Sequence, residues 1–481
     1  MENIQEQFKS FIQKYFCFEL SHSQQTAVDD FLRFIFGTKG SNEKTMWILR
    51  GYAGTGKTSL VASIIKALKE FKIESVLLAP TGRAAKVFSA YAGDSAFTVH
   101  KKIYRQKSTA DGEGKFSIGY NKSHNTLFFV DEASMISHIG EESNFGSGHL
   151  LDDLVEYIYN TSNNRLILIG DVAQLPPVGN RVDGVASISP ALNAAFLRSH
   201  YDVEVIETDM NEVFRQEELS GILSNATIVR EMIGSKKKQL QLLTEGMPDV
   251  ARITGAELLE ELDSCYGKYG MDETMVICYS NKRAAKYNEG IRRCILYREE
   301  EFSGGDRIMV VKNNYFWGKE QEDIDFIANG EIATVVKVRQ TAELYGFHFL
   351  NADISISGYE QDLSVWLLTD ILFSDAPALT YEQHRTLYHN IENDYRDIRS
   401  QRKRFEKIRE NPYYNAMQIK FAYAVTCHKA QGGQWDAVFV DQGWIKDDML
   451  DDTYWRWLYT AITRARKKVY FVNFKKEFFP L

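Results

Sequence analysis

The sequence lacks several features that mark whole classes of protein. None of its apolar runs approaches the roughly 20 residues that a membrane-spanning helix needs, so no membrane association is expected. Residues 1–6 lack the basic and apolar regions of a secretory signal peptide. The 5 cysteines are scattered, their number is odd, and none has the spacing of a zinc site. We therefore expect a cytoplasmic protein with reduced thiols.

An excess of positive charge is also missing. The formal net charge is −8 at pH 7, which argues against a protein that is basic over its whole surface. A local basic channel is compatible with this value, because electrostatic steering depends on the local field. The apolar fraction of 44% is ordinary for a globular protein. At 481 residues, the chain is long enough for about two to four domains.

What the sequence does contain is a glycine-rich loop, residues 51–58, between an apolar run at 46–49 and a helical pattern at 59–68. This strand–loop–helix context predicts a phosphate-binding loop rather than an ordinary glycine-rich turn. Lys57 would reach the β- and γ-phosphates of a nucleotide, and Thr58 would hold Mg²⁺. The nucleotide-binding residues expected here are Gly51, Ala53, Gly54, Thr55, Gly56, Lys57, Thr58 and Ser59.

Apolar runs alternate with helical patterns along the chain, which predicts an α/β fold of two lobes with parallel sheets. The first lobe is expected over 1–200, with strands near 46–50, 75–79, 126–130 and 165–169. The second lobe is expected over 201–299 and 412–481, with strands near 203–206, 275–279, 437–440 and 469–472. No second phosphate loop follows, so the second lobe is predicted to assist the first.

Three segments interrupt this alternation. The polar stretch 105–125 contains Asp111-Gly112 and predicts a β-hairpin inserted in the first lobe. Residues 300–375 contain β-rich pieces that predict a small antiparallel barrel, within an insertion covering 300–411. Residues 380–411 are highly charged and lack glycine and proline, which predicts a long helix or helical hairpin. Its charges could form a solvated face or contact DNA.

Acidic and amide side chains follow the third and fourth predicted strands. Asp131 and Glu132 come directly after 126–130. Asp131 would position Mg²⁺ through water, and Glu132 would polarise the water that attacks the γ-phosphate. Gln174 follows 165–169 and could contact the γ-phosphate, whereas Asp171 beside it could be only a helix cap.

Two arginines of the predicted second lobe, Arg215 and Arg464, are candidates for completing the charge around the nucleotide. A cleft between two lobes lets arginines from one side contact a nucleotide held by the other, as arginine fingers do. The catalytic residues expected are therefore Lys57, Glu132, Gln174, Arg215 and Arg464.

In chain order, these and further motifs resemble those of superfamily-1 DNA helicases of the RecD-like group. The matching stretches are 20–28, 79–86, 98–100, 130–135, 170–177, 214–215, 426–436 and 460–466. The resemblance implies two RecA-like lobes and a barrel like a Src-homology-three domain. It also implies ATP and Mg²⁺ as cofactors, and 5′→3′ translocation along single-stranded DNA.

The resemblance also assigns roles to residues. Gln24 would read the adenine, Phe214 would stack on it, and Gln434 would contact the sugar, although relatives often carry Glu at that place. The hairpin at 105–125 would be a pin that splits the duplex. The residues expected to contact DNA are Pro80, Thr81, Arg83, Thr98, His100, Asn281, Thr426 and His428.

The expected partners are single-stranded DNA, duplex junctions and replication or repair proteins, bound by a monomer. Two other functions remain open: a P-loop ATPase switch, and an assembly factor with an inactive nucleotide site. DNA-stimulated ATP hydrolysis would separate the helicase from the switch. The intact Lys57, Asp131 and Glu132 argue against the inactive site. No carboxylate cluster of a nuclease is recognised in the sequence.

Overall fold

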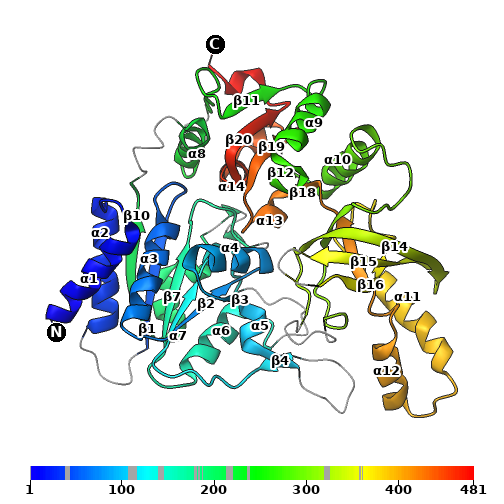
Figure 1. Ribbon diagram of the computed structural model, residues 1–481, viewed down its shortest axis with the longest axis horizontal. Helices are drawn as coiled ribbons and strands as arrows, with labels where there is room; N and C mark the ends of the chain where they lie inside the picture. Colours follow the sequence, from blue (N-terminus) through cyan, green and yellow to red (C-terminus); the bar gives the residue numbers. More distant parts are fainter. Residues whose placement is uncertain are drawn as a thin grey trace.

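The computed structural model of the chain contains two parallel sheets and a closed barrel (Figure 1). It describes residues 2–37, 44–106, 116–138, 146–177, 181–182, 185–186, 188–212, 220–235, 239–318, 326–356, 359 and 361–480. Within these residues, no helix combines the length and the apolar character needed to cross a membrane. All 5 cysteines are free thiols, as expected.

The first sheet has the strand order β10-β1-β7-β6-β2-β3, and its neighbouring strands are parallel. Successive residues of β1 face opposite sides, as the pleat requires. Trp47 packs into a core with α1–α4, and Met46 packs into a second core with α5–α7. The strands are β1 (Thr45–Gly51), β2 (Ser75–Ala79), β3 (Ala96–Thr98), β6 (Leu127–Val130), β7 (Arg165–Gly170) and β10 (Glu204–Met210). The helices are α1 (Glu2–Phe16), α2 (His22–Phe36), α3 (Lys57–Glu70), α4 (Gly82–Ala92), α5 (Val99–Ile103), α6 (Leu150–Tyr159) and α7 (Ala194–Tyr201).

The sequence analysis assigned residues 203–206 to the wrong lobe. These residues lie in or next to β10, which pairs in parallel with β1 from Thr45↔Glu204 to Gly51↔Met210. β10 is therefore the edge strand beside β1, and the first sheet ends at residue 210 rather than 200. An apolar run does not record which of two similar sheets it joins, so the sequence pattern could not make this distinction.

The second sheet has the order β11-β20-β19-β12-β18, again with parallel neighbours. Its strands are β11 (Val250–Ile253), β12 (Thr274–Cys278), β18 (Ala424–Thr426), β19 (Trp435–Asp441) and β20 (Ala465–Val472). Its helices are α8 (Gly221–Met232), α9 (Leu258–Tyr269), α10 (Asn281–Cys294), α13 (Cys427–Ala430) and α14 (Asp452–Ile462). Helix α14 lies on the side of this sheet that faces the first lobe (Figure 1).

The inserted barrel closes in the order β13-β14-β15-β16-β17. Its strands are β13 (Arg307–Val310), β14 (Ile332–Leu344), β15 (Phe347–Ile356), β16 (Leu363–Leu368) and β17 (Met417–Phe421). Two details of the prediction are wrong: the fifth strand lies in the range given to the second lobe, and β16 pairs with β17 in parallel. The charged stretch is a helical hairpin as predicted, with α11 (Tyr381–Glu392) and α12 (Gln401–Glu410) projecting from the barrel (Figure 1).

A buried ionic cluster ties the barrel to the second sheet. The Asp306 carboxylate, directly before β13, accepts hydrogen bonds from Arg292 Nε and Nη2 of α10, both at 3.0 Å. It also accepts one from the Tyr423 hydroxyl at 2.9 Å, and Tyr423 lies between β17 and β18. Asp306 is fully buried. Breaking a buried ion pair by removing one partner is strongly destabilising, so this cluster is expected to help hold the barrel against the second sheet.

Two small pairs of strands complete the fold. β4 (Tyr104–Gln106) and β5 (Phe116–Ile118) pair antiparallel at the predicted hairpin. The tip with Asp111-Gly112 lies outside the described residues. β8 (Arg181–Val182) pairs with β9 (Val185–Ala186), also antiparallel.

Candidate nucleotide site and nucleic-acid interface

The phosphate loop joins β1 to α3 at the carboxyl edge of the first sheet. Gly54 and Gly56 both have φ of +77°, a conformation that glycine adopts without steric cost. Lys57 begins α3, and its ammonium donates hydrogen bonds to the carbonyl oxygens of Gly51 and Tyr52. The loop therefore has the inward-turned backbone of an anion cradle, with the lysine folded along it. Thr58 and Ser59, next along α3, have exposed side chains.

Gln24 is fully buried at the start of α2. Its Oε1 accepts a hydrogen bond from the Ser21 N–H at 2.9 Å, which completes a capping box. Its Nε2 donates to the Thr55 carbonyl oxygen at 3.1 Å. The side chain predicted to read adenine thus contacts the backbone of the phosphate loop, so it links α2 directly to the nucleotide site.

The two acids lie at the end of β6, beside the phosphate loop. Asp131 accepts a hydrogen bond from the Tyr91 hydroxyl of α4, and its Oδ1 accepts one from the Glu132 N–H at 2.9 Å. Burial raises the pKa of Asp131, and the Tyr91 hydrogen bond opposes that rise. Glu132 has a φ of +51°, and such backbone strain concentrates at functional sites. Tyr91 is a contact that the sequence did not single out.

Arg464 reaches the acids from the second lobe. It lies just after α14, is 4% exposed, and places Nη1 3.7 Å from Glu132 Oε1. Its guanidinium is held by the carbonyl oxygens of Thr460, at 3.1 Å, and Gly433, at 3.3 Å. Burial raises the pKa of Glu132, and the charge of Arg464 is the largest influence opposing it. The other predicted pair, Phe214 and Arg215, lies outside the described residues.

The loop after β7 also touches the second lobe. The Leu175 N–H donates to Thr460 Oγ1 at 2.9 Å, and Gln431 Nε2 donates to the Leu175 carbonyl oxygen at 2.8 Å. Within the described chain, Gln174 Oε1 is buried and has no hydrogen-bond partner. An acceptor left in that position can receive a hydrogen bond from a bound group.

Tyr459 of α14 is a contact that the sequence analysis missed. Its hydroxyl accepts a hydrogen bond from the Ala53 N–H at 2.8 Å and donates to Asp171 Oδ2 at 2.6 Å. The matched motif began one residue later, at Thr460. A buried tyrosine in an apolar helix reads as core, so the only available signal was its position beside that motif.

In the first lobe, the predicted DNA-contacting threonines cap helices. Thr81 follows β2 and accepts a hydrogen bond from the Ala84 N–H at 3.2 Å, at the start of α4. Thr98 ends β3 and accepts one from the Lys101 N–H at 3.1 Å, at the start of α5. Pro80 lies between β2 and the Thr81 cap, and its side chain is half-buried. Because β2 and β3 are neighbours, these residues share one sheet edge.

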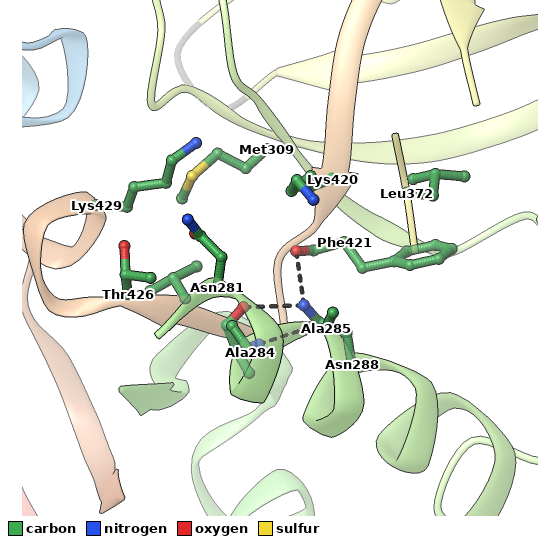
Figure 2. A pocket seen from close by; sticks show the side chains of 12 residues that line it. Asn281, Ala284, Ala285, Asn288, Met309, Leu372, Lys420, Phe421, Thr426 and Lys429 are labelled. Carbon is green, nitrogen blue, oxygen red and sulfur yellow. Dashed lines mark hydrogen bonds between the residues drawn. The ribbon is translucent and has the colours of Figure 1, made fainter. Parts of the chain in front are cut away.

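In the second lobe, Asn281 and Thr426 come together. Asn281 follows β12, Thr426 ends the neighbouring strand β18, and both line one small pocket with Lys429 (Figure 2). Figure 2 shows the side chains of Asn281, Thr426 and Lys429 gathered on one side of the first turn of α10. Burial, with the charge of Lys420, lowers the pKa of Lys429 to about 8. Lys420 and Lys429 were not predicted as site residues, although Lys420 lies shortly before the matched fifth motif and Lys429 lies within it.

The two predicted histidines differ in their surroundings. Burial lowers the pKa of His100 to about 4, and the charge of Asp153 opposes that shift. His100 is therefore uncharged at neutral pH. His428, on α13, is exposed by surface area, and partial desolvation lowers its pKa too. Neither ring supplies a permanent positive charge for DNA.

The lobes approach each other closely along α4. The Arg83 guanidinium lies 3.9 Å from the ring centroid of Trp435, the first residue of β19. Arg83 Nη2 also donates to the Gln434 carbonyl oxygen at 3.2 Å, while the Gln434 side chain is exposed. A Cβ placed on Gly432 would meet Ala84 Cβ at 2.9 Å. The first and second lobes are thus in van der Waals contact here.

The base of the hairpin contacts the barrel insertion. Phe116 of β5 packs against Tyr315, with ring centroids 4.5 Å apart. Tyr315 also packs against Phe326, at 5.1 Å. The hairpin therefore joins the first lobe to the inserted segment through aromatic contacts.

Two family models match the chain. Residues 38–180 match the AAA domain model, and residues 421–472 match the UvrD-like helicase C-terminal domain model. The chain is 24% identical to the ATP-dependent DNA helicase dda of Enterobacteria phage T4, covering 88% of this chain and 93% of that protein. It is 23% identical to the ATP-dependent RecD2 DNA helicase of Deinococcus radiodurans, covering 88% and 46%.

The chain is also similar to a longer protein and to solved structures. The chain spans only 36% of a longer uncharacterized protein from Methanocaldococcus jannaschii, to which it is 22% identical over 88% of its own residues. A solved Pif1 helicase from Bacteroides, in complex with ADP-AlF3 and ssDNA, aligns over 96% of this chain and 95% of that one. Its TM-score is 0.46 and its identity 14%.

The two family models match separate lobes, and the relatives align across both. The phosphate loop, the paired acids and the cross-lobe arginine lie where those lobes meet. The chain is similar to ATP-dependent DNA helicases, the phage T4 dda helicase and the RecD2 helicase among them, and it carries a match to the UvrD-like helicase C-terminal domain.

Proposed function

We propose that the chain couples ATP hydrolysis in the cleft to 5′→3′ movement along single-stranded DNA, and that this movement unwinds duplex DNA. One observation carries the proposal: Arg464 of the second lobe lies 3.7 Å from Glu132 of the first. A cation from one lobe beside the acid of the other makes hydrolysis depend on how the lobes sit, which is the requirement for a motor.

The phosphate loop, Gly51, Ala53, Gly54, Thr55, Gly56, Lys57, Thr58 and Ser59, would bind the triphosphate of ATP. Glu132 would polarise the attacking water, and Arg464 and Arg215 would stabilise charge on the γ-phosphate. Gln174 would report the γ-phosphate through its side-chain N–H, while its Oε1, unpartnered in the described chain, would be left to accept a hydrogen bond from water. Gln24, Phe214 and Gln434 would surround the adenosine.

The side chains of Thr58 and Asp131 fit a magnesium ion. Mg²⁺ prefers oxygen ligands and keeps several waters. Thr58 offers an exposed hydroxyl beside Lys57, and Asp131 offers a carboxylate after β6, at the same edge of the sheet. A bound Mg²⁺ would neutralise phosphate charge. The protein would then supply orientation: Tyr91 and the Glu132 N–H fix the Asp131 carboxylate by hydrogen bonds.

Single-stranded DNA would run along the carboxyl edges of both sheets. The hydroxyl and amide groups of Thr81, Thr98, Asn281 and Thr426 suit sequence-independent phosphate contacts. Lys429 adds charge in the pocket that Asn281 and Thr426 line. Pro80, Arg83, His100 and His428 border the same path. The hairpin at 105–125 would split the duplex at a junction.

We also propose a monomer that acts in the cytoplasm and meets replication or repair proteins. The relatives' printed activities support DNA as the substrate. As domains we propose a first lobe over 1–210, a second lobe over 211–299 and 422–480, and the barrel insertion over 300–421. The strand memberships support these boundaries.

Unwinding of duplexes with a 5′ tail or a 3′ tail tests the proposal. We expect ATP-dependent unwinding of the 5′-tailed duplex and ATPase activity that single-stranded DNA stimulates. Glu132→Gln should bind ATP but lose both activities. Unwinding of the 3′-tailed duplex alone would refute the polarity. An ATPase indifferent to DNA would favour the P-loop switch instead.

A further inference from the structure

Tyr459 is the residue of α14 whose side chain reaches two loops of the nucleotide site at once. Its hydroxyl oxygen accepts from the Ala53 N–H of the phosphate loop at 2.8 Å. The same hydroxyl donates to Asp171 Oδ2, after β7, at 2.6 Å. Tyr459 is 1% exposed and Asp171 is 3% exposed. One oxygen atom of the second lobe thus joins two separate loops of the first.

The protonation of this hydroxyl is fixed by its surroundings. Burial and the charge of Asp171 raise the pKa of Tyr459 well above its ordinary value. The hydroxyl therefore keeps its proton at all working pH values, and that proton points to the carboxylate. Asp171 Oδ1 meanwhile accepts from the Ala173 N–H at 2.9 Å, so both carboxylate oxygens are engaged. Within the described chain, the hydrogen bond that the Tyr459 oxygen accepts comes from the Ala53 N–H.

The Ala53 N–H belongs to the loop whose backbone donors cradle phosphates. A phosphate oxygen is a charged acceptor, and hydrogen bonds to charged acceptors are roughly twice as strong as neutral ones. A nucleotide in the loop would therefore compete with the Tyr459 hydroxyl for that N–H. Loss of the Ala53–Tyr459 hydrogen bond in this competition would affect the placement of α14 directly, because the phenol is a side chain of that helix.

The neighbours of Tyr459 extend the link in both directions. Thr460 Oγ1 accepts from the Leu175 N–H, and Arg456 donates to the Val172 carbonyl oxygen. Gln174 lies in the same loop, between Val172 and Leu175. On the other side, α14 leads through Thr463 to Arg464, which faces Glu132. Tyr459 is the point where this row of contacts meets the phosphate loop.

We propose that the Tyr459 hydroxyl is a positioning group that couples nucleotide in the phosphate loop to the placement of α14, and so to DNA held by the second lobe. This inference rests on the proposed function, because it requires that nucleotide and DNA bind to the same chain. It assigns the coupling to one oxygen atom rather than to the packing of the ring.

Tyr459→Phe removes that oxygen and keeps the ring. The chain offers a matched control in the same helix: Tyr454 is also fully buried, and its hydroxyl donates to Gln442 Oε1 at 2.5 Å, within the second lobe. Tyr454→Phe therefore removes a buried hydroxyl of α14 without touching the first lobe. Thermal unfolding of both variants shows whether each is folded.

The experiment measures the dissociation constant of a non-hydrolysable ATP analogue with and without a dT oligonucleotide, and the steady-state ATPase rate at saturating ATP. The ratio of the two dissociation constants is the coupling factor, which is reciprocal between the ligands. We expect Tyr459→Phe to bring this factor close to one and to lower DNA stimulation of kcat about tenfold. Tyr454→Phe should keep both values of the parent protein.

Two results would overturn the inference. The first is a Tyr459→Phe protein with the coupling factor and stimulation of the parent. The second is an equal loss in Tyr454→Phe, which would trace the effect to helix packing. A parent protein with no DNA stimulation would instead refute the proposed function, so the two failures are distinguishable.

Discussion

Glu132 lies where the two lobes meet, with its side chain largely buried and two cations, Arg464 and Lys57, close enough to influence it. Burial raises its pKa, and Arg464 acts against that rise. The carboxylate must be ionised to polarise water, so activity is present above the pKa and is lost as the pH falls through it. An isolated glutamate titrates at about 4.3. The acid limb of the pH–rate profile, where the rate falls as the solution becomes more acidic, should therefore lie above that value.

The first prediction concerns this limb. Arg464→Ala removes the larger of the two positive charges that oppose the rise, so the acid limb of kcat should move to higher pH. The rate itself should fall about 10³-fold, as loss of an arginine finger does. Arg464→Lys keeps a positive charge and should leave the limb nearer to its original position. ATPase rates of the three proteins across the acid range provide the measurement, and an unmoved limb in Arg464→Ala would falsify the assignment.

The second prediction concerns Lys429, whose pKa burial lowers to about 8. Its charge is present below that pH and is lost above it, so affinity for single-stranded DNA should fall as the pH rises through this range. One accessible charge contact is worth up to about 1 kcal/mol, or roughly fivefold in affinity. Lys429→Arg keeps its charge and should remove the pH dependence. Fluorescence anisotropy with a dT oligonucleotide is the assay; an identical pH profile in Lys429→Arg would exclude this contact.

At the scale of residues, those predictable from the sequence were the ones that stand in a motif with the right context. Lys57 follows a glycine-rich loop and begins a helix, and Asp131 and Glu132 follow a buried strand. Tyr91 and Tyr459 could not be predicted, because their hydroxyls act from within apolar helices. Only the fold brings Tyr91 to Asp131, and only the lobe contact brings Tyr459 to Ala53.

Among the elements, the hairpin of β4 and β5 connects two parts of the molecule. Its base is antiparallel, and Phe116 anchors it on Tyr315 of the insertion. Its location between the β3–α5 edge and the barrel places it beside the proposed DNA path rather than in the cleft. Duplex separation and ATP chemistry should therefore be separable by mutation.

The third prediction tests this separation. Replacing residues 107–115 by a short Gly-Ser turn removes the tip and keeps the β4–β5 pairing and the Phe116–Tyr315 contact. DNA-stimulated ATPase should stay within about twofold of the parent, while unwinding of a 5′-tailed duplex should fall at least about tenfold. A strand-displacement assay measures the second quantity. Unchanged unwinding would remove the hairpin from the mechanism and direct attention to the barrel.

The elements also show where pattern reading stops. Strands 46–50, 75–79 and 165–169 were located from apolar runs and punctuation, and the sheet contains them. β10 was assigned to the wrong sheet and β17 to the wrong domain. Both errors have one cause: a strand's partner is set by long-range packing, which a local run of apolar residues does not encode.

For the whole molecule, the contact between α4 and the loop that contains Gly432, between α13 and β19, limits how far the lobes can close. Gly432 has a φ of +71°, and a side chain there would meet Ala84 at 2.9 Å. The Arg83 guanidinium, which lies over the Trp435 ring, adds a second contact between the same two segments. The absence of a side chain at Gly432 thus permits the approach that brings Arg464 to Glu132.

The fourth prediction is that Gly432→Ala lowers DNA-stimulated kcat about tenfold by holding the lobes apart. Gly246→Ala is the matched control, because its φ is +73° but nothing lies within 4 Å of the added Cβ. Both variants should lose about 1 kcal/mol of unfolding free energy from backbone strain. Only Gly432→Ala should lose turnover. Equal ATPase rates in the two variants would show that this approach does not limit the motor.

The order of the strands also has a consequence for synthesis of the chain on the ribosome. Every strand of the first sheet has been made once residue 210 has emerged, so that sheet can form early. The second sheet must wait: among the described strands, β11 at 250–253 is an edge strand whose partner is β20 at 465–472. For more than two hundred residues, the backbone N–H and C=O groups of β11 lack the strand with which they pair. Slow translation or a chaperone would act on this half of the nascent chain.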